Sequence, residues 1–132
     1  MKVEEFTIST DSQGMIKITP MIRRALLKSG VENGICVIYC PHTTAAITIN
    51  ENADPDVVHD LLLGLSYTFP DRGDFLHTEG NSPAHLKSGA TGASQTVIIE
   101  DSGMLLGRWQ DIYFCEFDGP RQRTFYVKII EG

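Results

Sequence analysis

The sequence is poor in cysteine and in long apolar runs, and each shortage excludes a class of protein. Its three cysteines, Cys36, Cys40 and Cys115, form no CxxC pair. An odd and sparse cysteine count without a secretory leader pattern favours a reducing, cytoplasmic setting. The longest apolar runs, such as residues 61–63, fall far short of the roughly 18 residues that a membrane span needs. We therefore expect no membrane partner.

Basic residues are also in short supply. The chain has 11 Lys and Arg against 17 Asp and Glu, for a formal net charge of −6. Nucleic acids and anionic membranes are bound by clustered Lys and Arg, so neither is expected as a partner. A local basic pocket for one small anion remains compatible with this charge balance.

What the sequence does contain is enough apolar material for one domain over residues 1–132. Of its 132 residues, 42% are hydrophobic, and no linker or fixed-period repeat interrupts them. Helices are expected where a capping residue precedes proline, at Thr19-Pro20, Asp54-Pro55 and Asn81-Ser82-Pro83, and the third is expected to be a short helix through about Lys87. Strands are expected at residues 2–9, 15–18, 35–40, 43–49, 95–100, 104–106, 111–117 and 122–130. This order predicts an α+β fold with short helices against antiparallel or mixed sheets.

Three local features make sharper predictions. The near-continuous apolar run at residues 35–40 is typical of a strand buried on both faces. Residues 66–80 lack periodicity and form an unusually long loop, a length that is often functional. The turn residues Asp118, Gly119 and Pro120 predict a hairpin between the last two strands.

Three histidines are candidate metal ligands. His42 follows a buried strand, His77 lies in the long loop, and His85 lies in the first turn of the third helix. Three neutral imidazoles plus a water form a recurring open zinc site, and the helix N-terminus disfavours the charged form of His85. Their spacing matches no compact zinc motif, so structural hydrogen bonding remains the alternative. His59 falls on the polar side of its helix and is expected to be solvated.

Two acids and one amide are candidates for the chemistry around these histidines. Glu51 and Glu79 are available as a general base or as groups that orient an imidazole. Asn81 begins the third helix, where backbone N–H groups suit a phosphate or carboxylate.

Two arginines and the only tryptophan are candidate substrate-binding residues. Arg121 and Arg123 are two apart on one strand and project to the same side. They either clamp an anion or pair with Glu116 across the predicted hairpin. Trp109 either packs in the core or forms a stacking wall for an aromatic ligand.

Taken together, these segments resemble the YjbQ family, a family of small proteins often labelled secondary thiamine-phosphate synthase. The resemblance rests on His42-Thr43-Thr44-Ala45, Ile49-Asn50-Glu51-Asn52 with Asp54-Pro55, His77 with Glu79-Gly80-Asn81, Ala84-His85-Leu86-Lys87, Leu106-Gly107 with Trp109-Gln110, and Glu116-Phe117-Asp118-Gly119-Pro120-Arg121. It covers nearly the whole chain in one order. It implies an α+β sandwich assembled as a homotrimer, with a site near the subunit boundary built from the three histidines and nearby acids.

Trimer formation is also favoured by an apparent surplus of apolar strand positions. One small core should need fewer apolar strand residues than the chain supplies, and the surplus is represented by Tyr113, Phe117, Phe125 and Ile129.

Two functions follow as hypotheses. The first is a trimeric metalloenzyme acting on a small phosphorylated or anionic metabolite, either as a thiamine-phosphate synthase or as a metal-dependent hydrolase. Imidazole ligands favour zinc, whereas diphosphate chemistry favours oxygen-bound magnesium. Arg121 and Arg123 would hold the diphosphate, and Trp109 would face the heteroaromatic ring. The alternative is a non-enzymatic trimer that binds a small anion, with the histidines as hydrogen-bonding groups.

Overall fold

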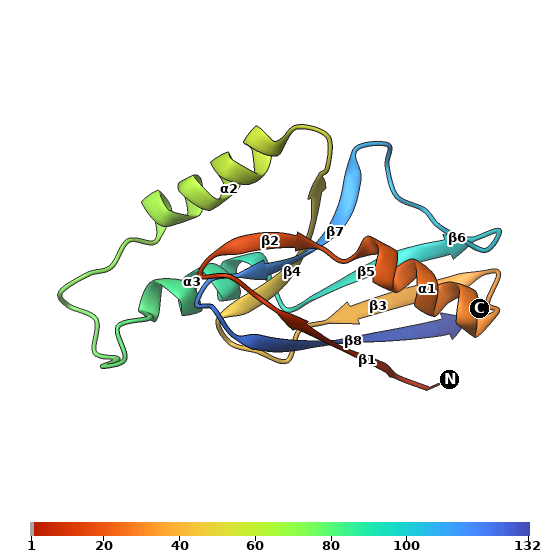
Figure 1. The fold of residues 1–132 in the computed structure, drawn as a ribbon, viewed down its shortest axis with the longest axis horizontal. Coiled ribbons are helices and arrows are strands. Elements are labelled where there is room, and N and C mark those ends of the chain that lie inside the picture. The colour runs from red at the N-terminus through yellow and green to blue at the C-terminus, as the bar shows by residue number, and fades with distance from the viewer. Residues whose placement is uncertain (1) are drawn as a thin grey trace.

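The computed structural model describes residues 2–132 and has two antiparallel sheets and three helices in that range (Figure 1). In chain order the elements are β1 (Glu4–Ser9), β2 (Gly14–Lys17), α1 (Thr19–Ser29), β3 (Gly34–Tyr39), β4 (Ala45–Glu51), α2 (Pro55–Thr68), α3 (Ser82–Thr91), β5 (Ser94–Glu100), β6 (Gly103–Met104), β7 (Gln110–Glu116) and β8 (Gln122–Glu131). The predicted α+β class is confirmed. No helix in this range is both long enough and apolar enough to cross a lipid bilayer.

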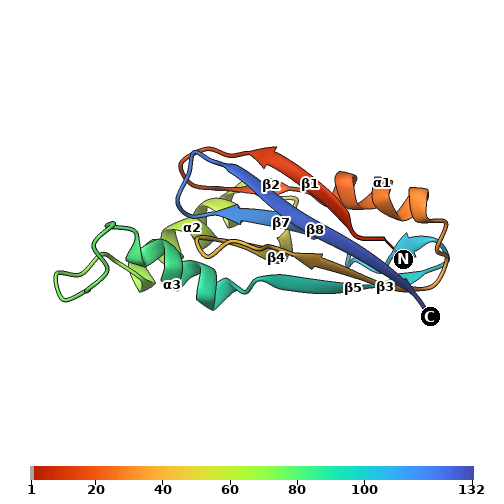
Figure 2. The same cartoon turned by 90° about the horizontal axis from the view of Figure 1, so that it is seen from below.

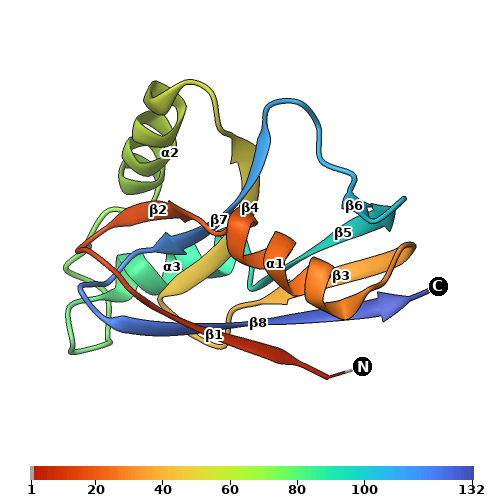
Figure 3. The ribbon, with the colours of Figure 1, turned by 45° about the vertical axis from the view of Figure 1, so that its right-hand side comes forward.

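The two sheets enclose the main core between them. The larger sheet has the strand order β1-β8-β3-β5-β6 and the smaller has β2-β7-β4. Inward side chains such as Ile38, Phe114 and Phe125 are fully buried between them. Helix α1 contacts both sheets and closes one side of this core (Figures 2 and 3). Helix α3 packs on β4, and α2 adds half-buried leucines to a second, smaller cluster.

The predicted hairpin between the last two strands is wrong. Strand β7 pairs with β2 and β4, whereas β8 pairs with β1 and β3, so the chain changes sheets between them. The connection from β1 to β2 changes sheets at the same place, and Thr10 N–H donates to the Arg121 carbonyl at 2.9 Å. Gly119 is required there because a Cβ would lie 1.8 Å from the Asp11 carbonyl oxygen. Turn residues mark a reversal of direction, but they do not specify which sheet the next strand joins.

The prediction that residues 35–40 are buried on both faces is also wrong for the single chain. Cys36 and Ile38 point inward and are fully buried, but Ile35 is 38% and Tyr39 is 47% exposed. The reason is that the smaller sheet and α1 cover only the inner face of the larger sheet.

The three helices begin at the expected places, but only one of the expected capping side chains acts as a cap, and two helices are longer than expected. Thr19 lies inside α1 and its Oγ1 accepts from the Ile112 N–H at 2.8 Å, and α2 continues to Thr68 into the expected loop. Asp54 caps α2, because its Oδ1 accepts from the Asp56 N–H at 2.9 Å. Helix α3 continues to Thr91 instead of ending near Lys87. Its extension is held on β4 by the Ser88 hydroxyl, which donates to the Ala45 carbonyl at 2.7 Å. The long loop between α2 and α3 leads directly into the site described next.

Candidate functional site

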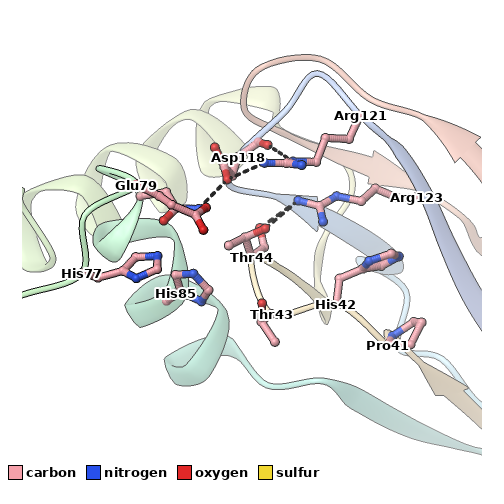
Figure 4. Close-up of a pocket in the computed structure, with 11 residues that line it drawn as sticks. Pro41, His42, Thr43, Thr44, His77, Glu79, His85, Asp118, Arg121 and Arg123 are labelled. Carbon is pink, nitrogen blue, oxygen red and sulfur yellow. Dashed lines mark hydrogen bonds and ion pairs between the residues drawn. The ribbon is translucent and has the colours of Figure 1, made fainter.

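A pocket of roughly 390 Å³ lies where three segments meet: the loop before β4, the loop before α3, and the connection from β7 to β8 (Figure 4). Its lining residues are Pro41, His42, Thr43, Thr44, His77, Glu79, Asn81, His85, Asp118, Arg121 and Arg123. All three candidate histidines, both arginines, Glu79 and Asn81 are therefore brought to one place.

A buried ion pair forms the floor of the pocket. Arg123 donates from Nε to Glu116 Oε1 at 2.8 Å and from Nη2 to Oε2 at 2.6 Å, and the two side chains are 5% and 1% exposed. Arg123 also donates to the Thr44 hydroxyl, and Thr10 donates to Glu116. Burial alone would raise the pKa of Glu116, but the hydrogen bonds from Arg123, Thr10 and the Asp118 N–H hold that pKa below its ordinary value. Arg123 thus forms the ion pair with Glu116 that the sequence offered as one of two roles for it.

A second, more exposed pair lies at the rim. Arg121 donates from Nη2 to Asp118 Oδ2 at 3.0 Å and from Nε to the Asp118 carbonyl at 2.7 Å. Asn81 donates from Nδ2 to the same carboxylate at 2.9 Å, and so it does not cap α3. Burial acts to raise the pKa of Asp118, but these donors hold it below its ordinary value. The other end of the amide, Asn81 Oδ1, is buried and has no hydrogen-bond partner within residues 2–132.

His42 is anchored to the larger sheet by its ring. Its Nε2 accepts from the Thr124 backbone N–H at 2.9 Å, so the neutral ring carries its proton on Nδ1. Burial, followed by the positive charge of Arg123, lowers the pKa of His42 below its ordinary value. Residues 40–44 form a loop, so β4 begins at Ala45 and not at residue 43 as expected.

His77 and His85 lie together on the opposite side of the pocket from His42 (Figure 4). Their rings meet edge to face, with centroids 5.3 Å apart. His77 comes from the loop, and the first turn of α3 places His85 beside it.

The arrangement does not fit a metal ion shared by all three histidines. No group of three or more His, Cys, Asp or Glu side chains in the described part of the chain is placed to hold an ion. His42 in particular has one nitrogen accepting from Thr124 and a proton on the other. A zinc ion at this pocket stays a prediction.

Glu51 and Trp109 lie away from the pocket. Glu51 lies seven residue steps along the chain from Thr44, which at 3.3–3.4 Å per strand residue is about 23 Å. Glu51 pairs with Gln110 at the far end of the smaller sheet. Trp109 is 53% exposed beside it, so it neither packs in the core nor faces the pocket. A role for either residue at this pocket would require a second copy of the chain.

A family model described as "UPF0047 protein YjbQ-like" matches residues 4–132. The chain belongs to this family. A YjbQ-like relative, the UPF0047 protein MJ1081 of Methanocaldococcus jannaschii, is 56% identical over 127 residues, which are 96% of this chain and 92% of the relative. The YugU protein of Bacillus subtilis is 51% identical and matches 92% of this chain and 93% of its own length.

Solved structures of YjbQ-like proteins share the whole fold. A YjbQ/UPF0047-family protein from Clostridium acetobutylicum superposes with a TM-score of 0.94 at 52% identity, covering 96% of this chain and 99% of that one. A hypothetical protein from Aeropyrum pernix reaches 0.93 at 32% identity and covers 100% of both chains. The family that the motifs resembled is confirmed.

Sequence reasoning missed several residues of this YjbQ-like pocket. Asp118 was interpreted only as a turn residue, yet it holds both Arg121 and Asn81. Its spacing of three residues before Arg121 was the available signal for an ion pair. Thr44 and Thr10 gave no comparable signal. Thr44 contacts Arg123 and Thr10 contacts Glu116 only because the chain changes sheets, and both partners are far away in the sequence.

Proposed function

We propose that the pocket binds a small phosphorylated or otherwise anionic metabolite and that the protein is an enzyme acting on it. The observation that carries this proposal is the pair of guanidinium groups lining one pocket with three histidines. The hydrogen bonds of Arg121 and Arg123 to the protein run through Nε and Nη2, which leaves Nη1 of each for a ligand. Arginine donors suit phosphate and carboxylate oxygens because these bonds are charge-assisted.

The remaining polar groups define what else the ligand must offer. The Nδ1–H of His42 is a further donor for a ligand oxygen. Asn81 Oδ1 is an acceptor without a partner in the described chain, and leaving such an atom unpaired costs about 1–3 kcal/mol. A ligand with anionic oxygens would accept hydrogen bonds from the two arginines and from His42, whereas Asn81 Oδ1 is covered by the chain itself.

Proton transfer is the chemistry that these residues can supply. Glu79 and the imidazoles of His77 and His85 line the same space, and both residue types serve as general acids or bases near neutral pH. This supports hydrolysis or group transfer at a small ester, amide or phosphate. Thiamine-phosphate synthesis is one such transfer, although Trp109 is not at this pocket to face its ring.

Metal-assisted chemistry is a second candidate, favoured by the closeness of His77 and His85. Rings with centroids 5.3 Å apart can supply two of the ligands of a zinc ion after small rotations. Magnesium would depend instead on Glu79 and a ligand phosphate. His42 could join only by giving up its hydrogen bond from Thr124.

We also infer that the protein assembles as a homotrimer. The apolar residues cited from the sequence do not support this, because Tyr113, Phe117, Phe125 and Ile129 are buried in the chain's own core. Support comes instead from the uncovered outer face of the larger sheet. There Ile98, Ile35 and Ile130 lie in register across β5, β3 and β8 and are exposed, beside the cross-strand pair Tyr39 and Tyr126. Apolar faces of this kind mark protein interfaces.

Calorimetric titration with inorganic phosphate and pyrophosphate tests anion binding. We expect saturable binding to the unmodified protein and a loss of at least about tenfold in affinity for Arg121→Gln, since one charge-assisted contact is worth about 1.5–3 kcal/mol. The matched control is Arg72→Gln, because Arg72 is an exposed arginine outside the pocket that pairs only with Asp74. Equal affinity in both variants would contradict the proposal. Binding without turnover on any small ester, amide or phosphate would support the non-enzymatic alternative.

A further inference from the structure

We propose that the ligand of this pocket is amphipathic: its anionic group carries an apolar hydrocarbon group, which lies in a second groove on the far side of His77 and His85. This inference rests on the proposed anion-binding function and names the class of ligand that the site takes.

The second groove adjoins the pocket at two shared side chains. It has a volume of roughly 530 Å³ and is lined by Asp74, Phe75, Leu76, His77, Ser82, His85 and Leu86. His77 and His85 line both spaces, so their edge-to-face pair is a common wall between them. A ligand held by the arginines would therefore reach the groove by passing over this pair of rings.

The chemistry of the two spaces is opposite. The pocket offers guanidinium, imidazole and amide groups, whereas the groove is lined by the apolar side chains Phe75, Leu76 and Leu86. The one charged residue of the groove, Asp74, is paired with Arg72 through two hydrogen bonds of 2.9 and 2.8 Å. An apolar group is thus the matching occupant.

The groove is built from two elements that present apolar groups to solvent. On α3, Ser82, His85 and Leu86 are three and four residues apart and share one face of the helix. Opposite them the loop carries Leu76, whose side chain is 94% exposed. Covering apolar surface contributes about 25 cal/mol per Å², so a ligand that covers these leucines gains affinity.

Calorimetry with two phosphonates that differ only in their apolar group tests the inference. Methylphosphonate and phenylphosphonate carry the same anionic group, and the carbon–phosphorus bond resists phosphatase chemistry. We expect phenylphosphonate to bind the unmodified protein at least about tenfold more tightly, from the apolar area that it covers. Leu76→Ser and Leu86→Ser should each reduce this ratio severalfold, while the affinity for methylphosphonate changes by less than about twofold. Leu76→Ser cannot disturb the core, because the side chain contributes almost nothing to it.

The matched control is Leu105→Ser, because Leu105 is an exposed leucine outside both spaces. This variant should bind phenylphosphonate more tightly than methylphosphonate by the same factor as the unmodified protein. Equal affinity for the two phosphonates, with both lost in Arg121→Gln, would overturn the groove and leave the anion pocket standing. A phenyl preference that survives both leucine variants would likewise overturn the groove. If neither phosphonate bound at all, the proposed function itself would be overturned.

Discussion

The backbone N–H of Thr124 donates to Nε2 of His42 at 2.9 Å. This bond ties the loop before β4 to strand β8 and fixes which nitrogen of His42 carries the proton. His42 therefore presents an N–H donor to the pocket, while His77 and His85 form a separate pair across from it. The three histidines share a pocket, but they do not share a role.

The first prediction separates these roles by zinc content. In protein loaded with zinc and freed of excess by dialysis, His77→Ala and His85→Ala should each lower occupancy strongly. His42→Ala should lower it much less, because Nε2 of His42 is already used. His59→Ala is the control, since His59 is exposed and bonded only to Asp60. Equal losses of zinc in all three pocket variants would show that His42 gives up its hydrogen bond from Thr124 to bind the ion.

The second prediction concerns the buried ion pair. Glu116→Gln leaves the Arg123 charge in a site that is 5% exposed, without its carboxylate. Breaking one partner of such a pair costs about 3–5 kcal/mol, and urea unfolding should show a loss of this size. Asp74→Asn, which breaks an exposed pair with Arg72, should leave the urea midpoint unchanged. If Glu116→Gln had the same urea midpoint as the unmodified protein, the buried ion pair would not contribute to stability as stated.

The third prediction is a loss of stability on mild acidification through His42. Its pKa is lower in the folded protein than the ordinary 6.5, so the unfolded chain binds more protons just below pH 6.5. The free energy of unfolding should therefore fall as the pH drops from 6.5 toward the folded pKa. His42→Gln should flatten this part of the profile, whereas His59→Gln should not. If the free energy of unfolding fell with the same slope in His42→Gln and in the unmodified protein, a group other than His42 would cause the loss.

A further loss should follow at lower pH from two carboxylates. The pKa values of Glu116 and Asp118 are held below their ordinary values of 4.5 and 3.8 in the folded protein. Their contribution is present above those values and disappears as the pH falls through the folded ones. Chemical unfolding at a series of pH values below 4.5 should show a larger total loss of unfolding free energy in the unmodified protein than in Asp118→Asn, because the variant lacks one of the two carboxylates.

The fourth prediction concerns assembly. Light scattering after size exclusion should give about three times the chain mass of 14.6 kDa. Ile35→Lys and Ile98→Lys place a charge on the outer face of the larger sheet and should release single chains. Leu63→Lys, at an exposed position of α2, should leave the mass unchanged. A mass of one chain for the unmodified protein would refute the trimer.

Much of the fold and part of the site were predictable because their signals are local. A capping residue followed by proline fixes where a helix begins, and all three helices begin within a residue or two of such positions. Alternating apolar residues placed the strands. The motifs also selected as candidates three histidines, two arginines, Glu79 and Asn81, and all of these line one pocket.

Only the tertiary structure decided how these elements combine. The order of strands in each sheet depends on contacts between distant residues, such as Thr10 with Glu116, and no local pattern encodes them. The change of sheet at Gly119 turned a predicted hairpin into the connection that brings Asp118, Arg121 and Arg123 to the pocket. The ring nitrogen of His42 that carries the proton is likewise set by a hydrogen bond from Thr124, which lies 82 residues further along the chain. The sequence determined which residues could do chemistry, and the pairing of the sheets determined which of them meet.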